Sequence, residues 1–347
     1  MTFVDIVFPA FLFISGMSIP LALGRKISAG MEKLGVLPVI FKRGLWLLII
    51  GVLMVNISGV NEELTGIHKH LWGTIVLISV IFFFNTIFKG ETKVVARAAS
   101  AVVILFMVYI FRSGTAVKPG WMQTKWWGII GLIGWAYLCN ALLYLFVRDN
   151  LKLIYAGVIF FLLLYIADKG GYFGAGGTET GIIRIGVQLG SHSFIMAAGM
   201  AALLTENELK KRKADAHIVY VYILMASLSF TAGWMLEPVY GINKNAATPG
   251  WALYATGWCL ALFGLLRKIP LTALNTRAGL ILSLAGSNAL LIYILPDIWY
   301  FLMSLSGVTL WARLSDGITG IIRSLVFAGV FTAAGAYLYK IRFRMQV

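Results

Sequence analysis

VIFFLLLYI, residues 158–166, and IVFPAFLFI, residues 6–14, are stretches with no charged or amide side chain. Long apolar runs of this kind are typical of membrane-embedded helices, whereas a membrane β-barrel alternates apolar and polar residues in short segments. Such runs recur along the chain of 347 residues, of which 60% are hydrophobic and 12% charged. At roughly 20 apolar residues per crossing, they are enough for about ten transmembrane helices. The sequence predicts an all-α, polytopic integral membrane protein and excludes a soluble enzyme or a disordered chain.

We expect about eleven transmembrane helices, within a range of about ten to twelve, in a single transmembrane domain over residues 1–347. Their expected bounds are 3–23, 36–57, 70–88, 94–112, 126–147, 151–167, 183–204, 217–236, 249–266, 284–304 and 317–339. Bounds read from apolar runs alone are soft by a few residues.

The basic residues indicate how these helices are oriented. The net charge is +15, and about 20 of the 29 Lys and Arg residues fall in one set of alternate loops. By the positive-inside rule that set, which includes the run 210–213, is cytoplasmic. The N-terminus is then outside and the C-terminus inside. Because the charge reports orientation, no nucleic-acid partner is expected.

An outside N-terminus is unexpected for this chain. Met1 is followed almost at once by an apolar helix, with no basic region that would mark a signal peptide. One further helix upstream would explain the orientation and give twelve crossings with both ends in the cytoplasm. The alternative is a genuine start on the outer side.

Charged and amide side chains inside membrane helices are costly, so each is a candidate site residue. Arg184, Gln188 and His192 follow one another at intervals of four and share a face of the helix expected over 183–204. Such a face lines a cavity or makes structural hydrogen bonds between helices. Asp5 lies at the outer end of the first helix, where it could orient a base, bind an amine or cap the helix.

The helix expected over 284–304 carries two further polar groups. Asn288 lies in its cytoplasmic half and Asp297 in its outer half, about 13 Å apart along the axis. Cys139 and Cys259 lie in apolar runs without a CxxC or other metal-ligand spacing, so no metal site is expected.

Three signals are weaker. Trp126 and Trp251 fall near helix ends, as residues of an aromatic belt do. Asn140 is a single amide, for which a packing role is the simplest interpretation. The loops 56–69, 168–181 and 237–249 lie on the expected outer side, where they could cover a site.

Two sequence patterns are specific. One covers the first expected helix, and the other begins in a late loop. They are MTFVDIVFPAFLFISGMSIPLAL, residues 1–23, and GINKNAATPGWALYATGWCLALFGLL, residues 241–266. Supporting strings are HLWGTIVLISV (70–80), GSHSFIMAAGM (190–200) and AGSNALLIYILPDIWYFL (285–302). In this order they resemble segments of the heparan-α-glucosaminide N-acetyltransferase family, in particular its bacterial branch. The resemblance extends over most of the chain.

The resemblance implies a transmembrane acyltransferase. Such an enzyme moves an acetyl group from cytoplasmic acetyl-CoA to an amino sugar or glycan acceptor on the periplasmic side. Dimers are known in this family, so the resemblance also implies a homodimer. The apolar helices predict contact with membrane lipid, and the Gly-rich short loops and close helix spacing favour a bacterial inner membrane. The family's catalytic histidine precedes the VFP helix, and this chain has no histidine there, which agrees with a missing upstream helix. The alternatives are a transporter or flippase without covalent chemistry and a catalytically degenerate family member.

The chemistry assigns roles to the candidates. The acceptor loses a proton as it attacks a thioester, so a base is required. We expect Asp5 and His192 to be catalytic, Asp5 on the basis of the resemblance and His192 because it shares a helix face with Gln188. Ser287 and Asn288 would lie along the CoA arm. The expected substrate-binding residues are Gln188, Asn243, Lys244, Asn245 and Asp297.

Overall fold

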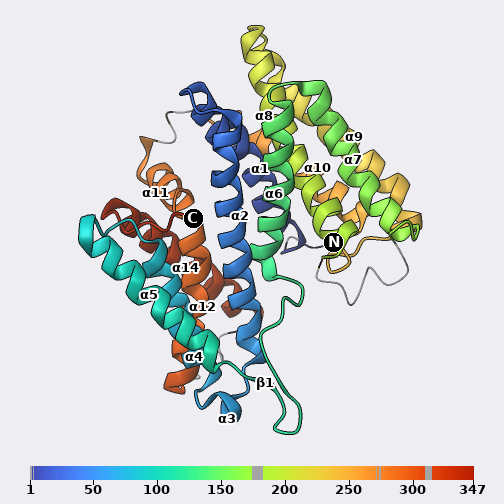
Figure 1. The fold of residues 1–347 in the computed structure, drawn as a ribbon. Coiled ribbons are helices and arrows are strands. Elements are labelled where there is room, and N and C mark those ends of the chain that lie inside the picture. The colour runs from blue at the N-terminus through green and yellow to red at the C-terminus, as the bar shows by residue number, and fades with distance from the viewer. Residues whose placement is uncertain (1, 3, 174–182, 271, 273–274, 309–314) are drawn as a thin grey trace. The chain divides into compact units, whose positions relative to one another are not determined.

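The protein is almost entirely helical. The computed structural model describes residues 1–347 except 1, 3, 174–182, 271, 273–274 and 309–314 (Figure 1). In this described part the β-structure is limited to a short hairpin and one isolated bridge. The hairpin pairs β1 (Ser113–Gly114) with β2 (Pro119–Gly120) in antiparallel register. The expectation of an all-α architecture is confirmed.

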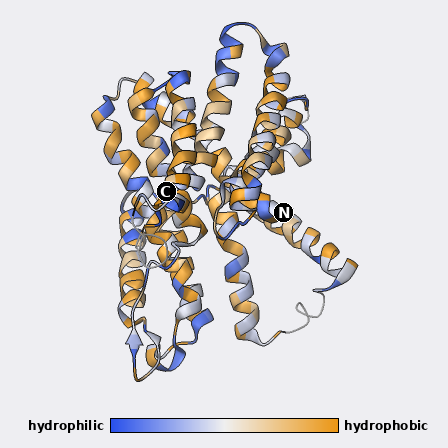
Figure 2. Ribbon diagram, turned by 90° about the vertical axis from the view of Figure 1, so that its right-hand side faces the viewer, coloured by the Kyte–Doolittle hydropathy of each residue, from blue (hydrophilic) through white to orange (hydrophobic). Residues whose placement is uncertain are grey.

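Ten helices in the described ranges are long and apolar enough to cross a membrane. Figure 2 shows hydrophobic residues along most of the helical ribbons and hydrophilic ones at many helix ends. Each of the eleven expected spans overlaps described helices, but α4 (Lys69–Phe84) has only 16 residues and the span 284–304 falls on two helices, so eleven crossings stay a prediction. The fold is that of a polytopic α-helical protein, and its apolar helices indicate an integral membrane protein.

The expected single domain folds into two compact units. Unit 1 comprises residues 1–51 and 126–269, and unit 2 comprises residues 52–125 and 270–347. The first of the three boundaries along the chain falls inside α2 (Lys33–Asn56). The other elements of unit 1 are α1 (Val4–Ser28), α6 (Gly128–Val147), α7 (Leu151–Lys169), η2 (Ile185–Ser191), α8 (His192–Lys211), η3 (Asp215–His217), α9 (Ile218–Tyr240) and α10 (Pro249–Leu266).

Helix α8 is the centre of unit 1. It packs against α1, α6, α7 and α10, and 94% of the apolar stretch in Ile185–Lys211 is buried. Its side chains are small where α1 crosses it. A Cβ atom on Gly199 would collide with the Phe13 carbonyl, and one on Gly16 would collide with the Met196 carbonyl. Glycines at this crossing let the two backbones touch, as small residues do between membrane helices.

Unit 2 packs less densely. Its elements are η1 (Ile57–Gly59), α3 (Glu62–Thr65), α4, α5 (Gly90–Ile110), β1, β2, α11 (Arg277–Gly286), α12 (Ala289–Ser306) and α14 (Gly317–Lys340). Helix α4 packs on α5 and α12, and α14 packs on α11 and α12. Only 11% of the apolar stretch of α5, and the same share of α14, is buried. These two helices turn most of their apolar surface outward, as membrane lipid requires.

The structure differs from two of the expected helices. The expected helix 284–304 is interrupted, because α11 ends at Gly286 and α12 begins at Ala289. The intervening Asn288 has a non-helical backbone (φ −123°, ψ 29°). The expected helix 183–204 begins as the π-helix η2 and becomes α-helical only at His192.

Candidate functional site

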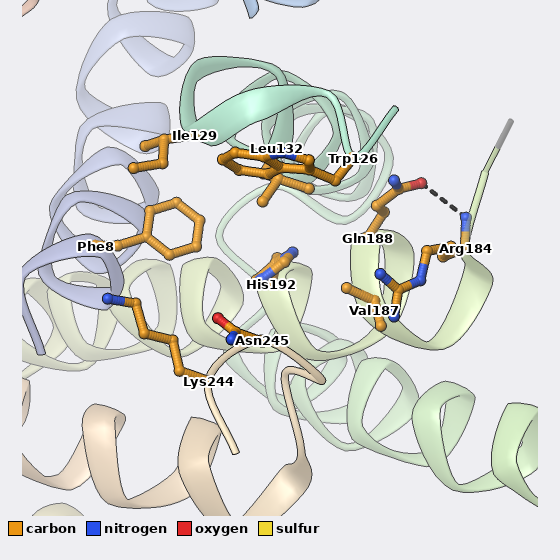
Figure 3. A pocket seen from close by; sticks show the side chains of 10 residues that line it. All are labelled: Phe8, Trp126, Ile129, Leu132, Arg184, Val187, Gln188, His192, Lys244 and Asn245. Carbon is orange, nitrogen blue, oxygen red and sulfur yellow. Dashed lines mark hydrogen bonds between the residues drawn. The ribbon is translucent and has the colours of Figure 1, made fainter. Parts of the chain in front are cut away.

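A pocket of about 390 Å³ lies within unit 1, among α1, α6, η2, α8 and the loop between α9 and α10 (Figure 3). We call it the His192 pocket. Its apolar side chains are Phe8, Trp126, Ile129, Leu132 and Val187. Its polar side chains are Arg184, Gln188, His192, Lys244 and Asn245. The structure therefore brings four of the expected site residues together, with Arg184 as a fifth polar group.

His192 lies in the middle of this group in Figure 3, between Phe8 and the side chains of Arg184 and Gln188. It is 3% exposed, and its ring meets Phe8 edge-on at a centroid distance of 5.3 Å. Among the described residues, nothing hydrogen-bonds to its buried Nδ1 atom. Leaving a buried polar atom unpaired costs about 1–3 kcal/mol. Such an atom in a pocket is a candidate for a catalytic or ligand-binding role.

The π-helix η2 sets the position of His192. Single π-helical turns are rare and occur frequently at functional sites. Gln188 is buried in η2, and its Oε1 atom accepts a 2.8 Å hydrogen bond from the Arg184 backbone N–H. One turn further on, Asn140 of α6 donates from Nδ2 to the Ser193 carbonyl at 3.1 Å. Asn140, which the sequence suggested was a packing residue, therefore anchors the backbone beside His192.

The loop between α9 and α10 brings Lys244 and Asn245 to the pocket. Asn243 does not line it but shapes this loop, because its Oδ1 atom accepts a 3.0 Å hydrogen bond from the Ala246 N–H. Thr248 closes the loop by accepting from the Asn243 N–H at 3.0 Å. The asparagine of the INKN pattern that comes first is thus a structural residue, and the lysine and asparagine after it face the pocket.

Asp5 lies next to the pocket rather than in its lining. Its carboxylate is 3.8 Å from the Lys244 ammonium and accepts a 2.8 Å hydrogen bond from the Thr2 N–H. Its backbone carbonyl accepts from Trp251 Nε1 at 3.3 Å. The Trp251 ring meets His192 edge-on, with centroids 6.2 Å apart. Asp5 therefore reaches the site through Lys244 and Trp251, and its catalytic role stays a prediction.

A second pocket, of about 560 Å³, is lined mainly by side chains of α1, α6 and α8, the three helices that also border the His192 pocket. We call it the Lys210 pocket; it is lined by Pro20, Leu21, Gly24, Tyr144, Asp149, Leu151, Leu204, Asn207, Glu208, Lys210 and Lys211. Along α8, His192 and Leu204 are about 18 Å apart by helical rise. The lining residues Phe8 and Pro20 of α1, and Leu132 and Tyr144 of α6, are separated along their helices by the same distance. The two pockets thus occupy opposite ends of α1, α6 and α8, with the Gly16–Gly199 crossing between them.

Ion pairs connect the ends of neighbouring helices near the Lys210 pocket. Glu206 is 1% exposed, and its carboxylate lies 2.7 Å from both Lys210 and Arg267. The Tyr222 hydroxyl donates to it at 3.0 Å. Since these partners come from α8, α9 and the end of α10, the buried carboxylate ties three helices together at this end.

The remaining expected site residues belong to unit 2. Asn288 is 1% exposed; its Nδ2 donates to the Phe343 carbonyl at 3.1 Å, and its Oδ1 accepts from the Met345 N–H at 3.2 Å. Ser287 is exposed and donates to the Ser283 carbonyl within its own helix. Asp297 is half-buried in α12. Their roles with CoA and substrate stay predictions.

The sequence did not predict that two tryptophans, Trp126 and Trp251, contribute to the site. Trp126 was expected in an aromatic belt, and it forms part of the pocket wall. Trp251 was expected there too, and it is fully buried against His192. The position of Trp251 directly after the INKN loop was the one signal that could have found it. Comparison with protein-family models gives no match, and comparison with curated proteins gives none.

Proposed function

We propose that this chain is a transmembrane acyltransferase. It would move an acetyl group from acetyl-CoA on the cytoplasmic side to an amine or hydroxyl of an amino sugar or glycan on the opposite, periplasmic side. The observation that carries this proposal is the buried His192, whose Nδ1 has no hydrogen-bond partner among the described residues, in a pocket at the opposite end of α1, α6 and α8 from the Lys210 pocket. The resemblance of the VFP and INKN segments points to the same activity.

The charge distribution supports the orientation that this reaction needs. Basic residues flank the Lys210 pocket at the ends of α1, α6, α8 and α10 and at the start of α7. They include Arg25, Lys26, Arg148, Lys152, Lys210, Lys211, Arg212, Lys213, Arg267 and Lys268. The positive-inside rule then directs this end to the cytoplasm and the His192 pocket outward. This is the orientation with the N-terminus outside and the C-terminus inside, in an inner membrane of a bacterial cell.

His192 would act as the general base. The acceptor nitrogen or oxygen attacks the thioester carbonyl carbon, so a bond to carbon forms as the carbon–sulfur bond breaks. A ring nitrogen of His192 takes the proton from the acceptor and returns it to the departing thiolate, giving free CoA. A histidine suits both steps because one imidazole nitrogen can accept a proton and then donate it. The amides of Gln188 and Asn245 line the same pocket and could donate to the developing oxyanion.

The Lys210 pocket would receive the nucleotide end of acetyl-CoA. Lys210 and Lys211 line it and suit phosphate groups, but Lys210 pairs with Glu206 at 2.7 Å and Lys211 with Glu208 at 3.9 Å, so the phosphates would have to compete with these carboxylates. The helix crossing at Gly16 and Gly199 separates this pocket from His192. The reaction therefore requires the pantetheine arm to pass beside that crossing, where two backbones touch.

Direct measurement of acetyl transfer tests the proposal. The purified chain in lipid nanodiscs would be incubated with radiolabelled acetyl-CoA and a panel of amino sugars. We expect labelled, N- or O-acetylated sugar and an equal amount of free CoA. Failure to bind acetyl-CoA, or binding with no transfer to any sugar of the panel, would contradict the proposed function.

One observation favours a second candidate, a transporter without covalent chemistry. Two pockets at opposite ends of the same helices, closed from one another by a tight crossing, are what alternating access to a substrate requires. A transporter would move unmodified sugar into proteoliposomes that contain no acetyl-CoA. An acyltransferase would leave the sugar outside.

A further inference from the structure

The charges of the His192 pocket identify what kind of acceptor it takes. Its lining includes two cationic side chains, Arg184 and Lys244, and no carboxylate among the described residues. Asp5, which could have bound an ammonium group, pairs with Lys244 instead. An acceptor that presents only a protonated amine would thus meet two positive charges and no negative one.

The two cations are not equivalent. The Lys244 charge is partly offset, because the Asp5 carboxylate is 3.8 Å away and the Val4 carbonyl accepts from its ammonium at 3.5 Å. Arg184 has no carboxylate within 4.0 Å among the described residues, and its buried Nε has no hydrogen-bond partner there. Figure 3 shows the two side chains on opposite sides of His192. Within the described part of the chain, Arg184 is therefore the pocket cation without a carboxylate partner.

The opposite wall of the pocket is aromatic and aliphatic. Phe8, Trp126 and Leu132 form it, on the side of His192 away from Val187 and Arg184 (Figure 3). An aromatic face of this kind suits the apolar face of a pyranose ring. A guanidinium, with its planar fork of donors, suits carboxylate and phosphate oxygens.

The geometry points to an amino sugar that carries an acidic group, a carboxylate or a phosphate, as the acceptor class. The acidic group binds Arg184, the ring lies on the Trp126 wall, and the reacting amine or hydroxyl faces His192. This inference rests on the proposed function for the identity of the reaction, but the binding it describes does not depend on acetyl transfer.

Binding without acetyl-CoA provides the test. Isothermal titration calorimetry on the full chain in nanodiscs would compare glucosamine with glucosamine 6-phosphate and with muramic acid, which carries a carboxylate. We expect at least one acidic sugar to bind about tenfold or more tightly than glucosamine, as charge-assisted bonds predict. The difference should shrink as salt screens the charges. Preference between the two acidic sugars decides between phosphate and carboxylate.

Arg184→Gln should reduce the affinity of the preferred acidic sugar to the level of glucosamine, and Arg184→Lys should keep part of the preference. The matched control is Lys169→Gln, which removes one positive charge from the exposed end of α7, outside the pocket lining. That variant should bind as the unmodified protein does. Unchanged thermal unfolding of all three variants verifies their fold.

Equal affinities for the acidic and neutral sugars, no binding of any of the three, or a preference that survives in Arg184→Gln would overturn the inference. An Arg184-dependent preference for acidic sugars in a protein that transfers no acetyl group would uphold it. The same result would refute the acyltransferase proposal, so the two proposals can fail separately.

Discussion

His192 in unit 1 and Asn288 in unit 2 are both buried polar residues beside the start of a helix, but their hydrogen bonding differs. Both ends of the Asn288 amide bind backbone groups of the C-terminal segment. The Nδ1 atom of His192 has no partner among the described residues, and the ring borders a pocket. A buried polar group with satisfied hydrogen bonds holds the fold together, whereas one with spare capacity in a cavity is available for a ligand.

The largest expected effect tests the His192 side of this comparison. His192→Asn removes the proposed base and keeps a polar side chain of smaller size. Acetyl transfer should fall about 10²- to 10⁴-fold in kcat/KM, the usual contribution of a general base. The control is His217→Asn, because His217 is exposed in η3. Turnover within twofold of the unmodified protein would show that His192 is not the base.

The glycines of the two units provide the next test. Gly199→Ala places a Cβ atom against the Phe13 carbonyl at the α1–α8 crossing, where neither backbone can yield. We expect it to destabilise the protein by about 1–3 kcal/mol, as overpacking does. Gly329→Ala in α14 meets nothing within 4 Å and should be neutral or stabilising by up to about 1 kcal/mol.

Thermal unfolding in detergent would measure both glycine variants under the same conditions. Equal midpoints would mean that the α1–α8 crossing is not tight in solution. The separation of the two pockets by that crossing would then be wrong as well.

Asn288→Ala tests the other side of the comparison. It leaves the Met345 N–H and the Phe343 carbonyl without their partner, which costs about 1–3 kcal/mol. Residues 341–347 should become sensitive to limited proteolysis, and CoA binding is measured on the same variant. Ser287→Ala is the control, because Ser287 is exposed and bonds only within its helix. Weakened CoA binding with an undisturbed C-terminus would support the cofactor role expected from the sequence, and the reverse result would contradict it.

The sequence predicts the helices well because each apolar run has to be helical in a membrane, whatever surrounds it. It also groups Arg184, Gln188 and His192 correctly in one pocket, although Arg184 precedes the helix and Gln188 lies in a π-helix, so the α-helical spacing that suggested the group is not what holds it together. The rest of the site depends on contacts between distant segments. Trp126 and Lys244 come to the same pocket as His192 only in the folded chain. The partners of Asn288 are 55 and 57 residues away, so no local pattern reveals that its amide is already used.

The smallest expected effect has the opposite sign to the others. Asp5→Asn removes the carboxylate that partly offsets Lys244, so the His192 pocket becomes more positive. The KM for an acidic acceptor should then fall by roughly two- to fivefold, the range of an exposed ion pair, with little change in kcat. Asp149→Asn makes the same charge change in the Lys210 pocket and should leave the acceptor KM unaltered. If Asp5→Asn instead abolishes turnover as His192→Asn does, Asp5 belongs to the catalytic machinery. Unit 1 would then hold two catalytic groups linked through Lys244 and Trp251.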